Sequence, residues 1–237
     1  MGDINGLIAQ AIRDVCRAMP WLTEAALRAT WVPSDKVATA SVDKRLRVFI
    51  NPAFFEQLNG RERAGVVAHE LLHVVLRHPQ RFPAVTDQVN LVTDAEINVA
   101  IQRVQALALP EGAIYPATIG ASDAETAEEM LSHLSHTEMR SIDDHGYPDW
   151  GVGAWSQADD LPSGLDPQEV EKIARACYIR AAHGQYGSAP GCIEREYQRT
   201  RYYIPWHRLL AGAVRGACAG RVTGWAIRRP HPCVAPD

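Results

Sequence analysis

The sequence predicts an α+β fold that is mostly helical, with a small sheet or β-hairpin packed beside a central helix. Long stretches of the 237-residue chain carry apolar side chains at helical spacing. Between residues 37 and 50 the pattern changes to short runs that are typical of strands. A chain of this length can bury one sizeable core, so we expect residues 1–237 to form a single domain.

Two helices are expected at the N-terminus, on either side of Pro20. Ile4 to Met19 is amphipathic, because its apolar residues recur three and four positions apart. Leu22 to Thr30 continues as a second helix after the proline, which interrupts a helix because it lacks the backbone N–H.

A β-hairpin is expected next. Val37 to Val42 and Arg45 to Ile50 are two short runs that flank Asp43-Lys44, and this arrangement indicates two strands joined by a turn. Asn51-Pro52 then ends the second run, because this dipeptide favours a turn.

Two long helices should follow the hairpin. Asn59, with a glutamate three residues later, resembles a capping box and predicts a helix from Arg61 to Arg77. Pro79 ends that helix. A second start signal, Thr86-Asp87, predicts a helix from Gln88 to Leu107 that is apolar on most faces and should therefore be buried.

The second half of the chain has a weaker pattern. Thr126 to His133 is expected to form a short acidic helix. Ser135 to Gly164 is expected to be a long, mobile surface loop, because it is rich in Asp, Gly, Pro and Ser. The remaining predicted elements are helices over Pro167 to His183, Glu194 to Tyr203 and Trp206 to Ala219, and an extended tail from Gly224 to Asp237.

Composition excludes several classes of protein. The formal net charge is −4, so we expect no nucleic-acid partner. No run approaches the ~18 apolar residues of a membrane span, and the N-terminus lacks the apolar core of a signal peptide, so we expect no membrane contact and a cytoplasmic location. The five cysteines are widely spaced, which favours reduced thiols over disulfides or a cysteine-based zinc site.

The segment His69-Glu70-Leu71-Leu72-His73 has the spacing of a metal site. On a helix, His69 and His73 lie one turn apart on the same side, so both imidazoles can bind one ion. Glu70 would lie beside the metal, where it can accept a proton from a metal-bound water. We therefore expect Zn²⁺ as the cofactor. The alternative is a chance match with two satisfied core histidines.

The third metal ligand is expected on the helix that follows. A catalytic zinc usually takes three protein ligands and leaves one position open. Asn90, Asp94 and Asn98 form a polar stripe on an otherwise apolar helix, so we predict that Asp94 binds the metal and that Asn98 or Asn90 holds a ligand imidazole. A solvated helix face is the alternative. Glu96 is the rival ligand, but it lies about 200° from Asp94 around the helix.

Other polar residues receive less specific roles. His78 lies about 140° from His73 around the helix, so we expect it to cap the helix end, and we expect Arg81 to pair with an acidic group. Arg45 to Ile50 is either an edge strand that binds an extended peptide or an ordinary strand that covers the core. Candidate donors to the oxyanion that develops on an attacked carbonyl are Tyr115, His145, Tyr147, Tyr202 and His207.

Further segments accompany these residues along most of the chain. They are Asn51-Pro52, His78, Arg81, Pro110-Glu111-Gly112, Ala124 to Leu131, Trp206 to Leu210 and Trp225 to Pro230. Together with the His69–His73 segment and the Asp94 helix, they resemble the putative metallopeptidase domain that lies N-terminal to a VWA-like domain in bacterial proteins. The residues from His231 to Asp237 are too few to form a VWA-like domain.

The resemblance implies a zincin-like α+β fold in which His69, His73 and Asp94 hold zinc and Glu70 is the catalytic base. It also implies a peptide or protein substrate. Members of the family often occur near MoxR-type AAA+ ATPases, so VWA-like and AAA+ ATPase partners are expected as well.

These observations together predict a zinc-dependent metallohydrolase, of the peptidase type, in which Glu70 activates a zinc-bound water. The alternative is a catalytically degenerate zinc-binding adaptor module in an AAA+ ATPase-linked complex, with the zinc closed off by a fourth protein ligand. A third hypothesis is that the loop from Ser135 to Gly164 covers the site or supplies that fourth ligand.

Overall fold

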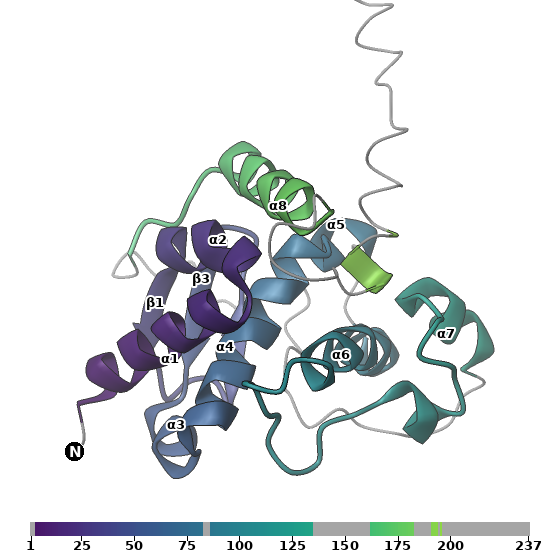
Figure 1. The fold of residues 1–237 in the computed structure, drawn as a ribbon, viewed down its shortest axis with the longest axis horizontal. Helices are drawn as coiled ribbons and strands as arrows, with labels where there is room; N and C mark the ends of the chain where they lie inside the picture. Colours follow the sequence, from purple (N-terminus) through teal and green to yellow (C-terminus); the bar gives the residue numbers. More distant parts are fainter. Residues whose placement is uncertain (1–2, 83–85, 135–161, 183–190, 194, 196–237) are drawn as a thin grey trace, which may run out of the picture. The chain divides into compact units, whose positions relative to one another are not determined.

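A helix that is buried on every side, α4, forms the centre of the fold, and Figure 1 shows it between α1 and α6. Every residue of α4 from Ala64 to Val75 is buried, because α1, α6, α8 and β2 all contact it. The computed structural model describes residues 3–82, 86–134, 162–182, 191–193 and 195, all of which belong to one unit, residues 1–198.

The elements follow one another in mostly helical order, which confirms the α+β class with a small sheet. The helices are α1 (Ile4–Ala18), η1 (Pro20–Leu22), α2 (Thr23–Arg28), α3 (Pro52–Gln57), α4 (Gly60–Val75), α5 (His78–Arg81), α6 (Asp87–Gln102), η2 (Pro116–Ile119), α7 (Ala127–His133) and α8 (Pro167–Ala182). The strands are β1 (Thr30–Pro33), β2 (Ala40–Val42) and β3 (Arg47–Ile50). No helix of the described part of the chain is both long and apolar enough to cross a membrane.

The sheet corrects one prediction. In the described residues it has three strands in the order β1–β3–β2, with β3 parallel to β1 and antiparallel to β2. The predicted hairpin is therefore present, but β3 is the central strand and all four of its residues are buried. Of the two alternatives for Arg45 to Ile50, the edge strand is wrong, because β3 pairs with β1 on one side and with β2 on the other, and the ordinary strand that covers the core is confirmed. The strand at the edge that contacts α4 is β2.

The second predicted helix ends early, and β1, a strand that the sequence analysis does not predict, begins at Thr30. α2 stops at Arg28, and the backbone becomes extended at Ala29, with ψ 143°. The Trp31 indole donates a hydrogen bond of 3.1 Å to the carbonyl of Ala26, which closes the turn between α2 and β1. A β-branched and aromatic run such as Thr30 to Val32 packs well on a sheet, and here it pairs in parallel with β3.

α4 begins at the capping box that the sequence predicts. The Asn59 side chain accepts hydrogen bonds from backbone N–H groups of the first turn, and the Glu62 carboxylate accepts one of 2.9 Å from the backbone of Asn59. At the other end, Arg77 adopts a left-handed backbone with φ 58°, so α4 stops before it. α5 follows at once, with Pro79 in its first turn, where a missing N–H removes no helical hydrogen bond.

α6 presents three different faces. One face packs into the main core, and another packs against α7 in a smaller cluster. The third carries the polar stripe of Asn90, Asp94 and Asn98. Every residue from Val89 to Ile101 is buried, so the stripe is not a solvated face. The main-core residues of α6 are Ile97, Ala100 and Ile101, and those packed toward α7 are Val89, Val92 and Ala95.

The other predicted elements have mixed outcomes. α1, α7 and α8 confirm helices that the sequence predicts, whereas α6 ends at Gln102 and not at Leu107. The cysteines of the described residues are free thiols, as expected, and burial raises the pKa of Cys177 and Cys192 to about 12. The predicted loop of residues 135–164 and the predicted helix of residues 194–203 lie mostly outside the described residues, and the predicted helix of residues 206–219 and the predicted tail of residues 224–237 lie entirely outside them.

The segment after α6 crosses α4 at Gly65. A side-chain carbon at Gly65 would lie 1.8 Å from the carbonyl oxygen of Ala108, so only glycine permits this approach. The Ala108 N–H donates to the Arg61 carbonyl at 3.1 Å, and the Arg61 guanidinium donates to the Leu107 carbonyl at 3.2 Å. These contacts hold the start of the segment that continues over residues 109–114.

We expect Gly65→Ala to lower the free energy of unfolding by about 1–3 kcal/mol, because the backbone of Ala108 must move away from the new methyl group. Gly60→Ala is the matched control. It lies on the same helix with nothing within 4 Å of the added carbon, so its stability should stay the same or rise. Urea unfolding of both variants measures the difference. Equal stability of the two would contradict the close approach.

Candidate metal centre

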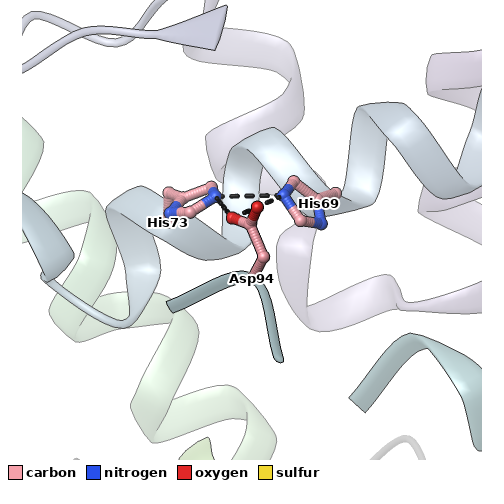
Figure 2. Close-up of side chains that lie close together, drawn as sticks. All are labelled: His69, His73 and Asp94. Carbon is pink, nitrogen blue, oxygen red and sulfur yellow. Dashed lines mark hydrogen bonds and ion pairs between the residues drawn. The ribbon is translucent and has the colours of Figure 1, made fainter. Parts of the chain in front are cut away.

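His69 and His73 of α4 and Asp94 of α6 come together in the interior, and Figure 2 shows both rings turned toward the carboxylate. The two Nε2 atoms lie 3.0 Å apart. Asp94 Oδ1 lies 3.5 Å from Nε2 of His69 and 3.4 Å from Nε2 of His73. All three side chains are buried. The structure therefore assembles the three residues that the sequence predicts as metal ligands.

These separations fit one metal ion. In a tetrahedral site with bonds of about 2.0–2.1 Å, neighbouring ligand atoms lie about 3.3 Å apart. The three measured distances, 3.0, 3.5 and 3.4 Å, fall on either side of that value. Two imidazole nitrogens and one carboxylate oxygen are also a donor set that binds transition metals well. Among the described residues, no fourth His, Cys, Asp or Glu joins the group.

Asn98, one of the two residues that the sequence offers for this role, holds the ring of His69. Its Oδ1 lies 2.9 Å from Nδ1 of His69, and its Nδ2 donates a hydrogen bond of 2.8 Å to the carbonyl of Ile114. The second bond orients the amide so that its oxygen faces His69. His69 Nδ1 is therefore the protonated nitrogen, and Nε2 presents its lone pair to the other two ligands.

His78 continues the contacts outward from His73. Its Nδ1 lies 2.9 Å from Nδ1 of His73, and its Nε2 lies 3.1 Å from Oε2 of Glu96. The prediction that His78 caps a helix end is wrong, because the left-handed residue Arg77 turns the chain so that the buried ring of His78 faces back to His73. Glu96 is not part of the three-residue cluster, as its direction on the helix predicts.

Arg81 completes this chain of contacts. Its Nη1 donates to Oε2 of Glu96 at 2.9 Å, and its Nε donates to Oε1 of Glu128 on α7 at 2.9 Å. Arg81 Nη1 also donates to the carbonyl of Leu76 at 3.3 Å, so Arg81 satisfies the end of α4. The expectation that Arg81 pairs with an acidic group is confirmed, with two partners.

The charges of this chain follow from burial and pairing. Burial, together with the charge of Arg81, lowers the pKa of His78 to about 4, although the hydrogen bond and the charge of Glu96 oppose this shift. His78 is therefore neutral at pH 7. Burial by itself would raise the pKa of Glu96, but the hydrogen bond from His78 and the charge of Arg81 hold it below its usual value. The ionised pair is thus Glu96 with Arg81, and His78 joins it as a neutral ring.

A pocket reaches the cluster from one side. It encloses about 570 Å³, part of it open to solvent, and His69, Glu70, Asp94 and Asn98 line it. Glu70 is 1% exposed, and it shares this pocket with two of the three clustered residues. Most of the remaining lining residues are apolar or glycine. They are Thr39, Phe54, Val66, Leu109, Pro110, Glu111, Gly112, Ala113 and Ile114.

Sequence reasoning missed the connection from His73 through His78 to Glu96. A signal for two residues of this chain of contacts was present, since His78 and Arg81 are among the residues that carry the family resemblance. None of the five candidate oxyanion donors is found at the pocket among the described residues. Tyr115 is not a lining residue of the pocket, and burial raises its pKa. The other four candidates lie outside the described residues.

Comparison with known proteins gives one match. A family model described as "Putative metallopeptidase domain" matches residues 7–232. No curated protein and no solved structure matches the chain significantly.

We expect Arg81→Met to lower the free energy of unfolding by about 3–5 kcal/mol, because it removes the cation that pairs with the buried Glu96 carboxylate. Arg77→Met is the control. Arg77 pairs with the exposed Glu171, and such a pair contributes at most about 1 kcal/mol. Chemical denaturation distinguishes the two variants, and similar losses for both would contradict the buried pair.

Proposed function

The chain belongs to the family described as "Putative metallopeptidase domain", and from this premise we propose that it is a zinc-dependent hydrolase of peptide bonds. One observation supports the proposal most: a pocket open to solvent leads to a cluster of two histidines and an aspartate and also contains a buried glutamate. The zincin-like description of the fold, which the resemblance implies, is part of this proposal.

Zinc is the metal that we propose for the cluster of His69, His73 and Asp94. Zinc binds imidazole nitrogen and carboxylate oxygen with short, tetrahedral bonds, and a catalytic site keeps three protein ligands and one open position. Both requirements agree with the spacing of the three ligand atoms and with the pocket beside them. The open side favours a catalytic site over a closed structural one.

Glu70 is the proposed catalytic base. Bound zinc would polarise the attacked carbonyl and favour ionisation of water at neutral pH. Glu70 accepts the proton of the attacking water and returns it to the leaving amine, which is the task of a general base that then acts as an acid. Asn98 keeps the His69 ring in place during these proton transfers.

The substrate that we propose is an extended peptide segment. β2 is an edge strand that contacts α4, and Thr39, just before it, lines the pocket. Asn51 holds this region: its backbone N–H donates to the Thr39 carbonyl at 2.8 Å, and its side-chain amide donates to the Val37 carbonyl at 2.8 Å. An extended peptide can add to such an edge by main-chain hydrogen bonds, with its side chains in the largely apolar pocket.

The adaptor alternative needs a closed zinc site or an inert Glu70, and the activity of the zinc-loaded chain tests it. The VWA-like and AAA+ ATPase partners and the cytoplasmic location stay predictions from the sequence. The hypothesis that residues 135–164 cover the site falls mostly outside the described residues.

We expect the purified chain to bind one zinc ion, and removal of zinc by a chelator to lower the melting temperature, since three buried ligand groups then lose their cation. Asp94→Asn should weaken zinc binding by at least about tenfold. Asp35→Asn, an exposed aspartate in the turn before β2, should bind as the unmodified chain does. Elemental analysis and chelator competition measure this, and a chain without a bindable transition metal would overturn the proposed function.

We expect Glu70→Gln to retain zinc and to lose hydrolysis by a factor of about 10²–10⁴, because glutamine has a similar shape but cannot accept the proton. Glu56→Gln, an exposed carboxylate on α3, is the control and should keep full activity. The assay is mass spectrometry of a mixed peptide library incubated with the zinc-loaded chain. If the zinc-loaded chain yields no cleavage products beyond those of the Glu70→Gln variant, the peptidase proposal is wrong and the zinc-binding adaptor is favoured.

A further inference from the structure

His78 lies between His73 and the buried pair of Glu96 and Arg81, and it has no part in the function proposed above. We propose that His78 is a positioning residue for the metal centre: it holds His73 in the tautomer whose Nε2 lone pair faces His69 and Asp94. This inference rests on the proposed metal centre, because it assigns a role toward the same ligands.

The argument begins at the outer end of the chain of contacts. Oε2 of Glu96 accepts a hydrogen bond from Arg81 and lies 3.1 Å from Nε2 of His78. An ionised carboxylate only accepts hydrogen bonds, so Nε2 of His78 must carry the proton. Arg81 already pairs with Glu96, and His78 is 0% exposed, so a second buried cation has no counter-charge here and the ring is neutral. Nδ1 of His78 is then unprotonated and can only accept.

The same reasoning continues to His73. Its Nδ1 lies 2.9 Å from the accepting Nδ1 of His78, so the proton of this contact belongs to His73 Nδ1. Nε2 of His73 is consequently unprotonated, and it is this atom that lies 3.0 Å from Nε2 of His69 and 3.4 Å from Oδ1 of Asp94. Glu96 thus determines, through His78, which nitrogen of His73 is available to a cation.

Burial strengthens this chain of contacts, because its members are shielded from water. His73 and His78 are 0% exposed and Glu96 is 4% exposed, so water does not offer substitute partners. The planes of the His73 and His78 rings cross at 76°, and the two Nδ1 atoms lie 2.9 Å apart. The ring of His73 is therefore held from α5 and α6, as well as from its own helix α4.

The two ligand histidines are positioned by different groups. His69 donates to the neutral amide of Asn98, whereas His73 donates to a neutral imidazole that is itself bonded to a carboxylate. A carboxylate one ring away makes the second ligand a stronger donor, since it polarises the intervening N–H bonds. Loss of such an outer contact typically lowers metal affinity by about 10–100-fold.

Three substitutions of His78 separate its two contacts. In His78→Asn, the side-chain oxygen takes the place of Nδ1 and can accept from His73, but the side chain is too short to reach Glu96. In His78→Gln, the amide reaches Glu96 but leaves no acceptor at the Nδ1 position. His78→Phe keeps an aromatic ring at this position and removes both hydrogen-bonding contacts. His133→Phe, at an exposed histidine of α7, is the control for the substitution itself.

The measurements are zinc affinity by competition with a chromophoric chelator, and ¹⁵N NMR of the histidine rings in the metal-free chain. We expect His78→Phe and His78→Gln to bind zinc about 10–100-fold more weakly and to show His73 as a mixture of tautomers. His78→Asn should stay within about threefold of the unmodified affinity and retain the His73 tautomer, because the acceptor that it supplies is the one that acts on His73. His133→Phe should change neither quantity.

Two outcomes would overturn the inference. One is unchanged zinc affinity in His78→Phe. The other is equal loss in the Asn, Gln and Phe variants at equal melting temperatures, which would mean that His78 only supports packing. Both differ from failure of the proposed function, in which the unmodified chain itself binds no zinc or cleaves no peptide. Because the NMR measurement uses the metal-free chain, it reports the tautomer whether or not hydrolysis is observed.

Discussion

The rest of this structure depends on one constraint: ionisable side chains are buried between α4 and α6, two helices whose central residues have no contact with solvent. α4 and α6 are each buried around their whole circumference over more than three turns. Helices of this kind ordinarily carry only apolar residues, because a buried polar group without a partner costs on the order of 2–7 kcal/mol. Here they carry His69, Glu70, His73 and Asp94, so the surrounding elements are arranged to supply partners or, in our proposal, a cation.

Partners reach the buried cluster from elements that lie far apart in the sequence. Asn98 joins His69 to the carbonyl of Ile114, and Ile114 is also a wall of the pocket. The same segment is held at its start by the contact of Ala108 with Gly65, one turn before His69 on α4. The ligand ring and the pocket wall are thus anchored to the same two helices. A peptide bound against that wall would meet a site whose geometry is already formed, which lowers the cost of ordering it.

The second ligand shows how charge is handled at depth. His73 is joined through His78 to Glu96, and Arg81 neutralises Glu96 before the chain of contacts reaches the surface at Glu128. Each buried group from His73 to Arg81 in this chain of contacts has a partner of opposite charge or complementary hydrogen-bonding character, which is the condition under which buried ions are tolerated. The short helix α5 carries both His78 and Arg81. It begins directly after Arg77, whose left-handed backbone changes the direction of the chain between α4 and α5.

Local sequence determined much of this protein. Helical periodicity and capping residues predict α1, α4, α6, α7 and α8, and the spacing of His69, Glu70 and His73 with Asp94 predicts which side chains meet, because a helix repeats every 3.6 residues whatever its surroundings. Tertiary structure decided what local periodicity does not encode. The sequence analysis does not predict β1, and its pairing with β3 makes β3 the central strand and leaves β2 at the edge. His78 turned inward because a single backbone angle at Arg77 reversed its direction, and its partner Glu96 comes from a helix that only folding brings beside it.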